Sequence, residues 1–514
     1  MIKNFFVLFF SVIFCVHAQP KLAVVFVVDA FAKHYIDKLN NFFDAGLRKL
    51  LDDGVVYTNA FYPHAVLSTA VGHTSLGTGA VPAMHGVIAN SWYTSNGTKD
   101  ELSDKNISGT IMVPSLAEKL VRKNNNNKVI ALSLKDRAAL GMVGAQLPAI
   151  WFDKKTGKFI AQHSNSTISE LLNFLNNKIN KTRVLNWQPA YADKKYYNFD
   201  LINNYEHAAS ASLFLPELPV DIKMARKKFL DVFVKSPDSN QLLLDGAFWY
   251  IEKAYRLLAV DAIFMVWISL SSLDSVGHLY GPDSREAIDT VYHLDKQLDN
   301  FINNLSKIIK SKDVFYALTA DHGIMPIVEL SQKKHVHARR VITSELLKTI
   351  NNSIEKKFGI TNIIWRCDEP NLYLDQQKLK KLSFDQQKKI RKFIRIKLGA
   401  YPGIDRAFDT QELAQKKVSV GSTAWHYRNN IYLGRSGDFM FHVAPYSVVS
   451  AYKTGTSHYM AQPYDMHVPL ILYQPGVLKH KTIKLRVWVN QLTATLAKLF
   501  GLERPKYFFE PLPM

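Results

Sequence analysis

Acidic residues and histidines follow several hydrophobic segments of this sequence. Carboxylates and imidazoles of this kind are the ligand types that zinc and similar divalent ions prefer. Asp274 and His278 have i,i+4 spacing, so on a helical turn their side chains face the same way, whereas the adjacent Asp321 and His322 point in different directions. Such a set suits a two-metal site, which stabilises both the attacking and the leaving oxygen of a phosphoryl transfer. The predicted ligands are Asp29, Asp274, His278, Asp321, His322 and His467.

Each of these residues also has a structural interpretation. An Asp after a strand often caps a helix, and an Asp-His pair is common in loops, so the metal hypothesis depends on the set as a whole. The remaining singled-out histidines lack the strand-end placement, and we interpret them as structural or close to substrate. They are His34, His64, His73, His85, His335, His337 and His458.

A hydroxyl nucleophile is predicted at Ser68-Thr69, which precede Gly72 and His73. A hydroxyl at a helix N-terminus is stabilised by the backbone dipole when it becomes an alkoxide or a phosphate ester. A metal ion would lower its pKa further. The alternative is a residue that only caps the helix.

Two basic residues, Lys135 and Arg137, flank Asp136 in a short polar segment. A phosphate monoester is a dianion with several exposed oxygens, so Lys and Arg can give it charge-assisted hydrogen bonds that strengthen in the transition state. A diester has a single charge and a second organic group that would crowd such a clamp. The alternative is an ordinary solvated turn.

Three continuous apolar segments, 22–28, 262–270 and 314–319, predict buried strands of a parallel sheet. Each has an Asp at or just beyond its carboxyl end, which is the edge where open α/β sheets bind ligands. Periodic apolar residues predict an amphipathic helix over 288–308 and a C-terminal helix over 489–500, followed by Gly501. The alternation predicts an α/β fold with a doubly wound, mostly parallel sheet flanked by helices.

Two segments differ in residue composition from this core, and this difference predicts that they are insertions. One covers about 186–238 and is aromatic and contains proline, and the other covers about 334–452. We interpret the second as an inserted α+β subdomain with a basic helix that begins near Ser383.

The chain has 514 residues, with 64 Lys and Arg against 44 Asp and Glu, giving a net charge of +20. This excess suits an anionic partner without choosing among nucleic acid, lipid and phosphorylated substrates. Residues 1–18 have a basic start, an apolar stretch and small residues at the end, which predicts a signal peptide cut after Ala18 and a periplasmic or secreted protein of residues 19–514. Cleavage would leave Cys367 as the one cysteine, and no later segment is long and apolar enough to span a bilayer.

The order of motifs resembles the alkaline phosphatase superfamily, most closely the secreted, phosphate-insensitive bacterial phosphatases of the PafA type. The motifs are Val28-Asp29, Thr69-x-x-Gly72-His73, the segment 85–93, Asp274-x-x-x-His278, Asp321-His322-Gly323 and Asp465-Met466-His467-Val468-Pro469. They extend over most of the chain, whereas the insertions match in position alone.

The resemblance implies roles for individual residues. Thr69 would be the nucleophile that forms a phosphothreonine, and Asn90 would bind a phosphate oxygen. Lys135 and Arg137 match a pair found in the monoesterase branch of the superfamily. One zinc ion would be held by Asp29, Thr69, Asp321 and His322, and a second by Asp274, His278 and His467.

These observations predict an exported phosphomonoesterase with two zinc ions that acts on small phosphate monoesters and has no specific nucleic-acid partner. The first alternative is a nucleotide pyrophosphatase or phosphodiesterase on the same scaffold. Another is a surface-binding protein without catalysis that uses its basic insertion.

Overall fold

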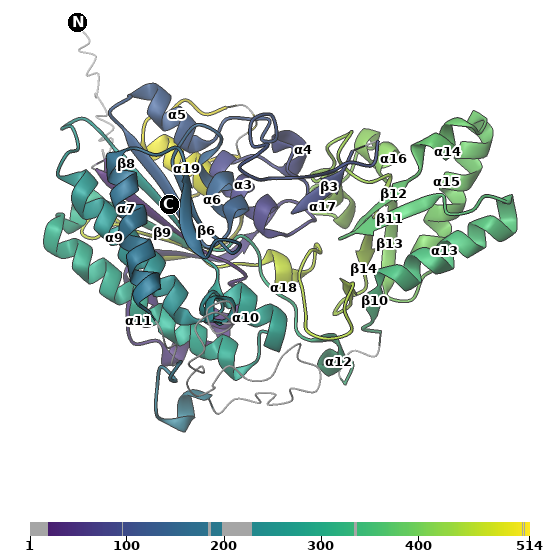
Figure 1. The fold of residues 1–514 in the computed structure, drawn as a ribbon. Coiled ribbons are helices and arrows are strands. Elements are labelled where there is room, and N and C mark those ends of the chain that lie inside the picture. The colour runs from purple at the N-terminus through teal and green to yellow at the C-terminus, as the bar shows by residue number, and fades with distance from the viewer. Residues whose placement is uncertain are drawn as a thin grey trace, which may run out of the picture.

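The computed structural model describes residues 19–94, 96–182, 187–197, 229–333, 337–505, 507 and 509–514 (Figure 1). The predicted signal peptide and most of the predicted insertion at 186–238 lie outside the described residues. None of the helices in the described ranges combines the length and hydropathy needed to cross a membrane.

A nine-stranded sheet in the order β17-β2-β16-β9-β1-β8-β5-β6-β7 forms the centre of the larger part of the molecule. Its strands are β1 (Leu22–Val28), β2 (Val55–Phe61), β5 (Lys128–Ser133), β6 (Ala149–Asp153), β7 (Lys158–Gln162), β8 (Phe264–Leu270), β9 (Val314–Thr319), β16 (Leu470–Tyr473) and β17 (Lys481–Trp488). The predicted α/β sheet flanked by helices is confirmed. The sheet is mixed because β16 and β7 run antiparallel to their neighbours.

The three strands predicted from apolar segments are β1, β8 and β9, and every residue in them is buried. They are neighbours and run parallel, with β5 next to β8 in the same direction. Burial on both faces explains why their sequences lack polar alternation. The carboxyl ends of these four strands therefore meet at one edge of the sheet.

Helices cover both faces of this sheet (Figure 1). One group of helices that pack against one another consists of α2 (Gly46–Asp53), α7 (Ser166–Lys181), α9 (Pro237–Tyr255), α10 (Ser272–Tyr280) and α11 (Arg285–Ile308). Another comprises α3 (Thr69–Thr78), α4 (Pro82–His85), α5 (Leu116–Lys123), α6 (Asp136–Val143) and α19 (Gln491–Leu499). Shorter elements are α1 (Lys33–Leu39), β3 (Ser91–Tyr93), β4 (Lys99–Glu101), α12 (Val328–Ser331), β10 (Arg340–Ile342), β15 (Val448–Ser450) and α18 (Pro463–Met466).

A smaller four-stranded antiparallel sheet in the order β11-β12-β14-β13 lies beside the large one. Its elements are β11 (Ile364–Asp368), β12 (Asn371–Leu374), β13 (Ile404–Asp409), β14 (Phe439–Val443), α13 (Thr343–Phe358), α14 (Gln376–Lys380), α15 (Phe384–Gly399), α16 (Thr410–Gln415) and α17 (Thr423–Arg428). Most of this sheet and helices α13 to α15 share a hydrophobic cluster separate from the main core. We call this part the inserted subdomain.

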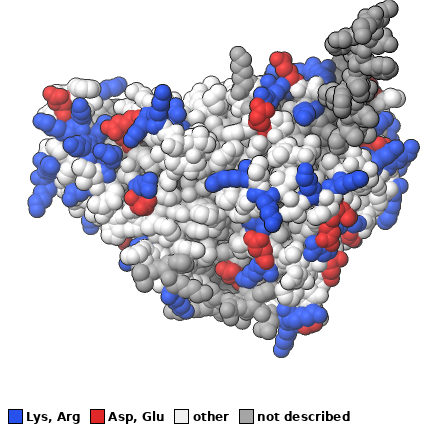
Figure 2. All heavy atoms as spheres, turned by 180° about the vertical axis from the view of Figure 1, so that it is seen from behind, with Lys and Arg blue, Asp and Glu red and all other residues white. Residues whose placement is uncertain are grey.

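The basic helix predicted from the sequence is α15, which begins directly after Ser383. The Ser383 side chain accepts the Gln386 N–H and the Gln386 side chain accepts the Ser383 N–H, forming a capping box. Seen from behind, Lys and Arg side chains gather over the end of the molecule that the inserted subdomain forms, on the left of Figure 2. Five basic residues of α15 are exposed: Lys388, Lys389, Lys392, Arg395 and Lys397.

His85, at the end of α4, is fully buried and hydrogen-bonded at both ring nitrogens. Its Nδ1 accepts the Val87 N–H at 3.1 Å, so its Nε2–H donates to the Ser75 hydroxyl at 3.0 Å. Burial, followed by the charge of Arg435, lowers the pKa of His85 to about 3. The folded protein therefore holds this histidine neutral.

We expect His85 to make the protein less stable in acid. The unfolded chain binds a proton near pH 6.5 and the folded chain does not until about pH 3, so His85 lowers the free energy of unfolding by about 1.4 kcal/mol per pH unit as the pH falls through that window. Urea unfolding of wild type and His85→Gln at pH 5 and pH 7 measures this slope. The slope should become shallower in His85→Gln and stay unchanged in His480→Gln, an exposed control. Equal slopes in wild type and His85→Gln would contradict the assignment.

Candidate active site

The candidate site lies at the edge where the parallel strands end. Asp29 directly follows β1, Asp321 lies just after β9, and Asp274 is in the first turn of α10, which follows β8. Lys135 caps the N-terminus of α6 after β5. Residues far apart in sequence meet here because the strands that precede them are parallel neighbours.

One cluster consists of Asp29, Asp321 and His322, whose ligand atoms lie within 4.8 Å of one another. The Nε2 of His322 is 3.2 Å from Asp321 Oδ2 and 3.5 Å from Asp29 Oδ1. His322 Nδ1–H donates to the Gly323 carbonyl at 2.8 Å, which fixes the ring with Nε2 toward the carboxylates. All three residues are fully buried.

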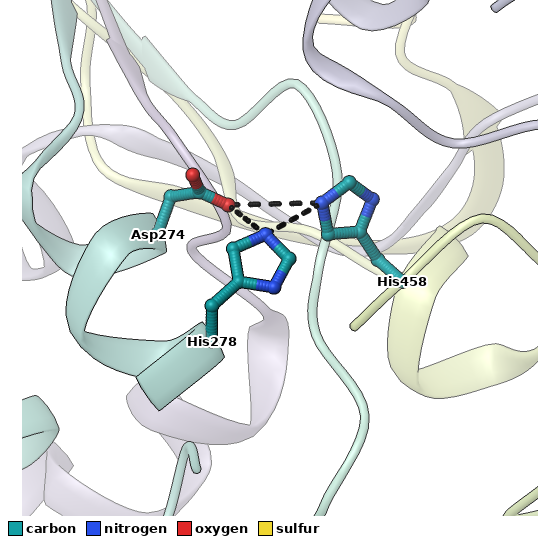
Figure 3. Close-up of side chains that lie close together, drawn as sticks. All are labelled: Asp274, His278 and His458. Carbon is teal, nitrogen blue, oxygen red and sulfur yellow. Dashed lines mark hydrogen bonds and ion pairs between the residues drawn. The ribbon is translucent and has the colours of Figure 1, made fainter. Parts of the chain in front are cut away.

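A second cluster consists of Asp274, His278 and His458 (Figure 3). The Nε2 of His278 is 3.2 Å from both Asp274 Oδ1 and His458 Nε2. His278 Nδ1–H donates to the Thr456 carbonyl at 2.8 Å, and His458 Nδ1–H donates to the Leu67 carbonyl at 2.5 Å. Both rings therefore present Nε2 to the same point. The two clusters adjoin each other, since the rings of His322 and His458 stack at 3.7 Å.

The prediction that His467 joins this cluster is corrected by the structure. The ring of His467 stacks on Phe61 at 4.3 Å, and its Nε2 bonds the Thr58 carbonyl at 2.8 Å. His458, which the sequence left as structural or close to substrate, lies in the place predicted for it. His467 lies just before strand β16, which is antiparallel to β9, so the start of β16 is at the same sheet edge as the end of β9. His458 lies in a loop that no neighbouring strand marks in the sequence.

Thr69 is the first residue of α3, with Ser68 in extended conformation before it. The Thr69 hydroxyl lies 3.3 Å from Lys135 Nζ. Asn90 Oδ1 accepts the Ala70 N–H at 3.0 Å, which holds the Asn90 amide at the N-terminus of the same helix. The structure thus brings Thr69, Asn90 and Lys135 together.

Helix α3 approaches Asp321 closely because residue 72 is glycine. A Cβ on Gly72 would lie 2.2 Å from the Asp321 carbonyl oxygen, which is a severe clash. His73 adds a polar link, since its Nδ1 lies 2.8 Å from the Thr69 carbonyl and 3.3 Å from Asp321 Oδ2. Helix α3 and the first cluster are therefore packed directly together.

Lys135 connects the two clusters. Its ammonium donates to Asp29 Oδ2 and Asp274 Oδ2, each at 2.5 Å. Burial raises the pKa of Asp29 well above its usual range, and the neighbouring carboxylates Asp274 and Asp321 raise it further. Three buried carboxylates thus share a small space, and they require positive charge.

Arg137 lies in the first turn of α6, two residues after Lys135. Its Nε is buried and has no hydrogen-bond partner among the residues that the structure describes. Its nearest acid is Asp136, with the guanidinium 4.0 Å from the carboxylate. The guanidinium therefore keeps donors for a further anion.

The model of the type I phosphodiesterase / nucleotide pyrophosphatase family matches residues 23–468. The chain belongs to this family. Two of its curated relatives are named alkaline phosphatases. PafA of Elizabethkingia meningoseptica is 28% identical over 95% of this chain and 92% of its own, and PhoV of Synechococcus elongatus is 28% identical over 95% and 91%.

Solved structures of this fold agree with the sequence relatives. The crystal structure of PafA has a TM-score of 0.83 at 25% identity, covering 96% of this chain and 98% of its own. Murine ectonucleotide pyrophosphatase/phosphodiesterase 5 has a TM-score of 0.54 at 15% identity, covering 94% and 96%. The alkaline-phosphatase-like fold expected from the motifs is therefore confirmed.

Proposed function

We propose that this protein is a phosphomonoesterase with two zinc ions that cleaves small phosphate monoesters through a phosphothreonine on Thr69. The observation that carries the proposal is the place of Lys135, within hydrogen-bond range of Thr69 and between two clusters of metal-ligand type. The relatives named alkaline phosphatase support it, since they cover almost the whole chain.

The residues present suit two divalent ions. The atoms that would face them, Asp29 Oδ1, Asp321 Oδ2, His322 Nε2 and Asp274 Oδ1, are buried and have no hydrogen-bond partner within the described part of the chain. Mixed nitrogen and oxygen donors of this kind fit zinc. One ion would be held by Asp29, Asp321, His322 and Thr69, and the other by Asp274, His278 and His458. Bound ions of this type lower the pKa of a nucleophilic hydroxyl and neutralise charge on the leaving oxygen.

The protein's own residues would work as follows. Thr69 Oγ attacks phosphorus, the ester P–O bond breaks, and the alcohol oxygen leaves with the electron pair and gains a proton. Water then cleaves the phosphothreonine, which releases inorganic phosphate and restores the Thr69 hydroxyl. Lys135, Arg137 and Asn90 bind the nonbridging oxygens, where charge-assisted hydrogen bonds strengthen as charge shifts in the transition state.

A solved variant of PafA supports these assignments. It carries replacements of one threonine, one asparagine, one lysine and one arginine. The separation of its threonine and asparagine along the chain equals that of Thr69 and Asn90, and its lysine and arginine are spaced as Lys135 and Arg137 are. The four positions therefore correspond in residue type, and each pair corresponds in spacing.

Diester cleavage is the second candidate, because the matching family model describes phosphodiesterases and nucleotide pyrophosphatases. The basic pair Lys135 and Arg137 favours monoester cleavage, since it suits a dianion without a second organic group. We also propose export, on the basis of the signal-like residues 1–18.

The test compares a nitrophenyl phosphate monoester with the bis-nitrophenyl diester. We expect faster monoester turnover, and Lys135→Ala and Arg137→Ala should each lower the monoester kcat/KM by about 100-fold. The diester kcat/KM should change by less than about tenfold. Lys158→Ala, at an exposed position on β7, is the matched control. Faster diester turnover that the two substitutions leave unchanged would refute the monoesterase proposal.

A further inference from the structure

Helix α15 is held on the small sheet by one side of its surface. Arg391 donates from Nε and Nη2 to the Asp409 carboxylate at 2.7 and 2.9 Å, and from Nη1 to Asp438 Oδ1 at 3.1 Å. The apolar residues that pack into the hydrophobic cluster of the inserted subdomain are Ile390, Ile394 and Leu398. These contacts fix the orientation of the helix, so its opposite side faces solvent.

The solvent side of α15 carries four basic residues, Lys388, Lys389, Lys392 and Arg395. All four are exposed, and none of them has an ion pair or a side-chain hydrogen bond with any residue that the structure describes. The helix has one acidic residue, Asp385, in its first turn. Like charges three or four residues apart on a helix repel one another, so this arrangement costs stability and does not supply it. The cations are therefore available for an anionic partner.

Two large apolar side chains lie on the same side of the helix. Phe384 is 80% exposed and Ile396 is 54% exposed. Together with Lys388 and Lys392 they recur every four residues, so the four side chains form one stripe along the helix. We call this stripe, with Lys389 and Arg395, the α15 face.

The combination favours a lipid surface over a polyanion in water. An anionic bilayer attracts lysine and arginine through its headgroups, and its interface also takes up apolar side chains. Single-stranded nucleic acid gains from stacking on aromatic rings, which Ile396 lacks. The exposed aliphatic side chain among the cations is therefore explained by a bilayer and left unexplained by a nucleic acid.

Exposed lysines continue this positive surface beside α15. Helix α13 packs against α15, with the rings of Phe358 and Phe393 in edge contact at 5.4 Å. The surrounding exposed lysines are Lys348, Lys356 and Lys357 on α13, Lys380 and Lys381 at the end of α14, and Lys397 on α15. The exposed acids of α13 are Glu345 and Glu355. This end of the molecule, which lies away from the large sheet in Figure 1, therefore has an excess of positive charge.

We propose that the α15 face binds the surface of an anionic lipid bilayer. The four cations lie against lipid phosphates, and Phe384 and Ile396 insert between the headgroups. This inference goes beyond the proposed function, because it gives the inserted subdomain a role in holding the protein at a membrane surface. No residue of the α15 face belongs to the proposed catalytic machinery, so binding and turnover can be measured separately.

The experiment measures cosedimentation of residues 19–514, which contain every described element, with lipid vesicles. We expect binding to vesicles of phosphatidylglycerol and phosphatidylcholine, and none to phosphatidylcholine alone. The triple variant Lys388→Gln/Lys392→Gln/Arg395→Gln should bind about 100-fold more weakly, because each basic residue near an anionic bilayer contributes about fivefold. Its melting temperature should not change, since the replaced side chains are exposed and unpaired.

A charge-matched variant separates this face from net charge. Lys479→Gln/Lys481→Gln/Lys484→Gln removes three exposed lysines on and beside β17, and should leave binding within about threefold of wild type. An equal loss from the β17 variant, or no binding of wild type to anionic vesicles, would overturn the inference.

The apolar residues test the choice of partner. Phe384→Ser/Ile396→Ser should weaken vesicle binding by about tenfold and make the remainder more sensitive to salt. Vesicle binding that this variant leaves unchanged, or tighter binding of wild type to a single-stranded oligonucleotide than to anionic vesicles, would assign the α15 face to a polyanion and refute the lipid proposal.

Discussion

Replacing Thr69 by alanine should lower kcat for a phosphate monoester by at least about 1,000-fold, because removal of a covalent nucleophile leaves binding and electrostatic stabilisation alone. Thr69 begins α3, and its hydroxyl lies 3.3 Å from Lys135 Nζ. The hydroxyl therefore already lies next to a proposed phosphate-binding group. Initial rates on nitrophenyl phosphate measure the loss. Thr69→Ser keeps a hydroxyl and should retain much of the activity.

The neighbouring hydroxyl gives the control. Ser68 is fully buried at the cap position, and we expect Ser68→Ala to keep kcat within about tenfold of wild type. Acid quench of the reaction with a radiolabelled monoester should trap a phosphate on Thr69, and peptide mass should locate it. The Thr69→Ala variant should carry no trapped phosphate. Label on Ser68, or full turnover by Thr69→Ala, would show that the nucleophile is assigned wrongly.

The second large effect concerns His467, which the sequence predicts as a metal ligand, and His458, which the structure places in the second cluster instead. His458→Ala should weaken zinc binding at one site by more than about 100-fold and reduce activity accordingly, because it removes a ligand from a cluster of three. His467→Ala should leave zinc content unchanged, since that ring stacks on Phe61 and bonds the Thr58 carbonyl. Zinc per chain after dialysis against graded chelator measures both.

The comparison is matched because each variant removes one buried or partly buried imidazole at the same sheet edge. His467→Ala still loses a ring contact, so a lower melting temperature with full zinc content is its expected result. Zinc loss from His467→Ala with normal zinc content in His458→Ala would restore the assignment made from the sequence.

The sequence predicted the parts of the molecule that depend on continuous burial. Apolar segments identified β1, β8 and β9, and the i,i+4 spacing of Asp274 and His278 identified a shared face of α10. These signals are local, so no knowledge of distant contacts was needed. The strand ends then brought Asp29, Asp274 and Asp321 to one edge.

The parts that were missed depend on loops and on packing between segments. His458 lies outside regular structure, and its Nε2 is aimed at the site by a bond from its Nδ1–H to the Leu67 carbonyl, far away in the chain. Asp368 of the inserted subdomain lies next to the site because its carboxylate accepts a hydrogen bond from the Ser91 hydroxyl. Neither contact has a periodic pattern, so the sequence alone gave no indication of either.

The close approach at Gly72 has a consequence for how this site can change. A single methyl group there would collide with the Asp321 carbonyl oxygen, so the helix that carries Thr69 has no room to move closer to Asp321. The Thr69 helix and the Asp29, Asp321 and His322 cluster consequently form one packed unit, and the absence of a side chain at Gly72 sets the spacing between them. Changes in the surrounding loops and the inserted subdomain can alter substrate contacts without altering this spacing.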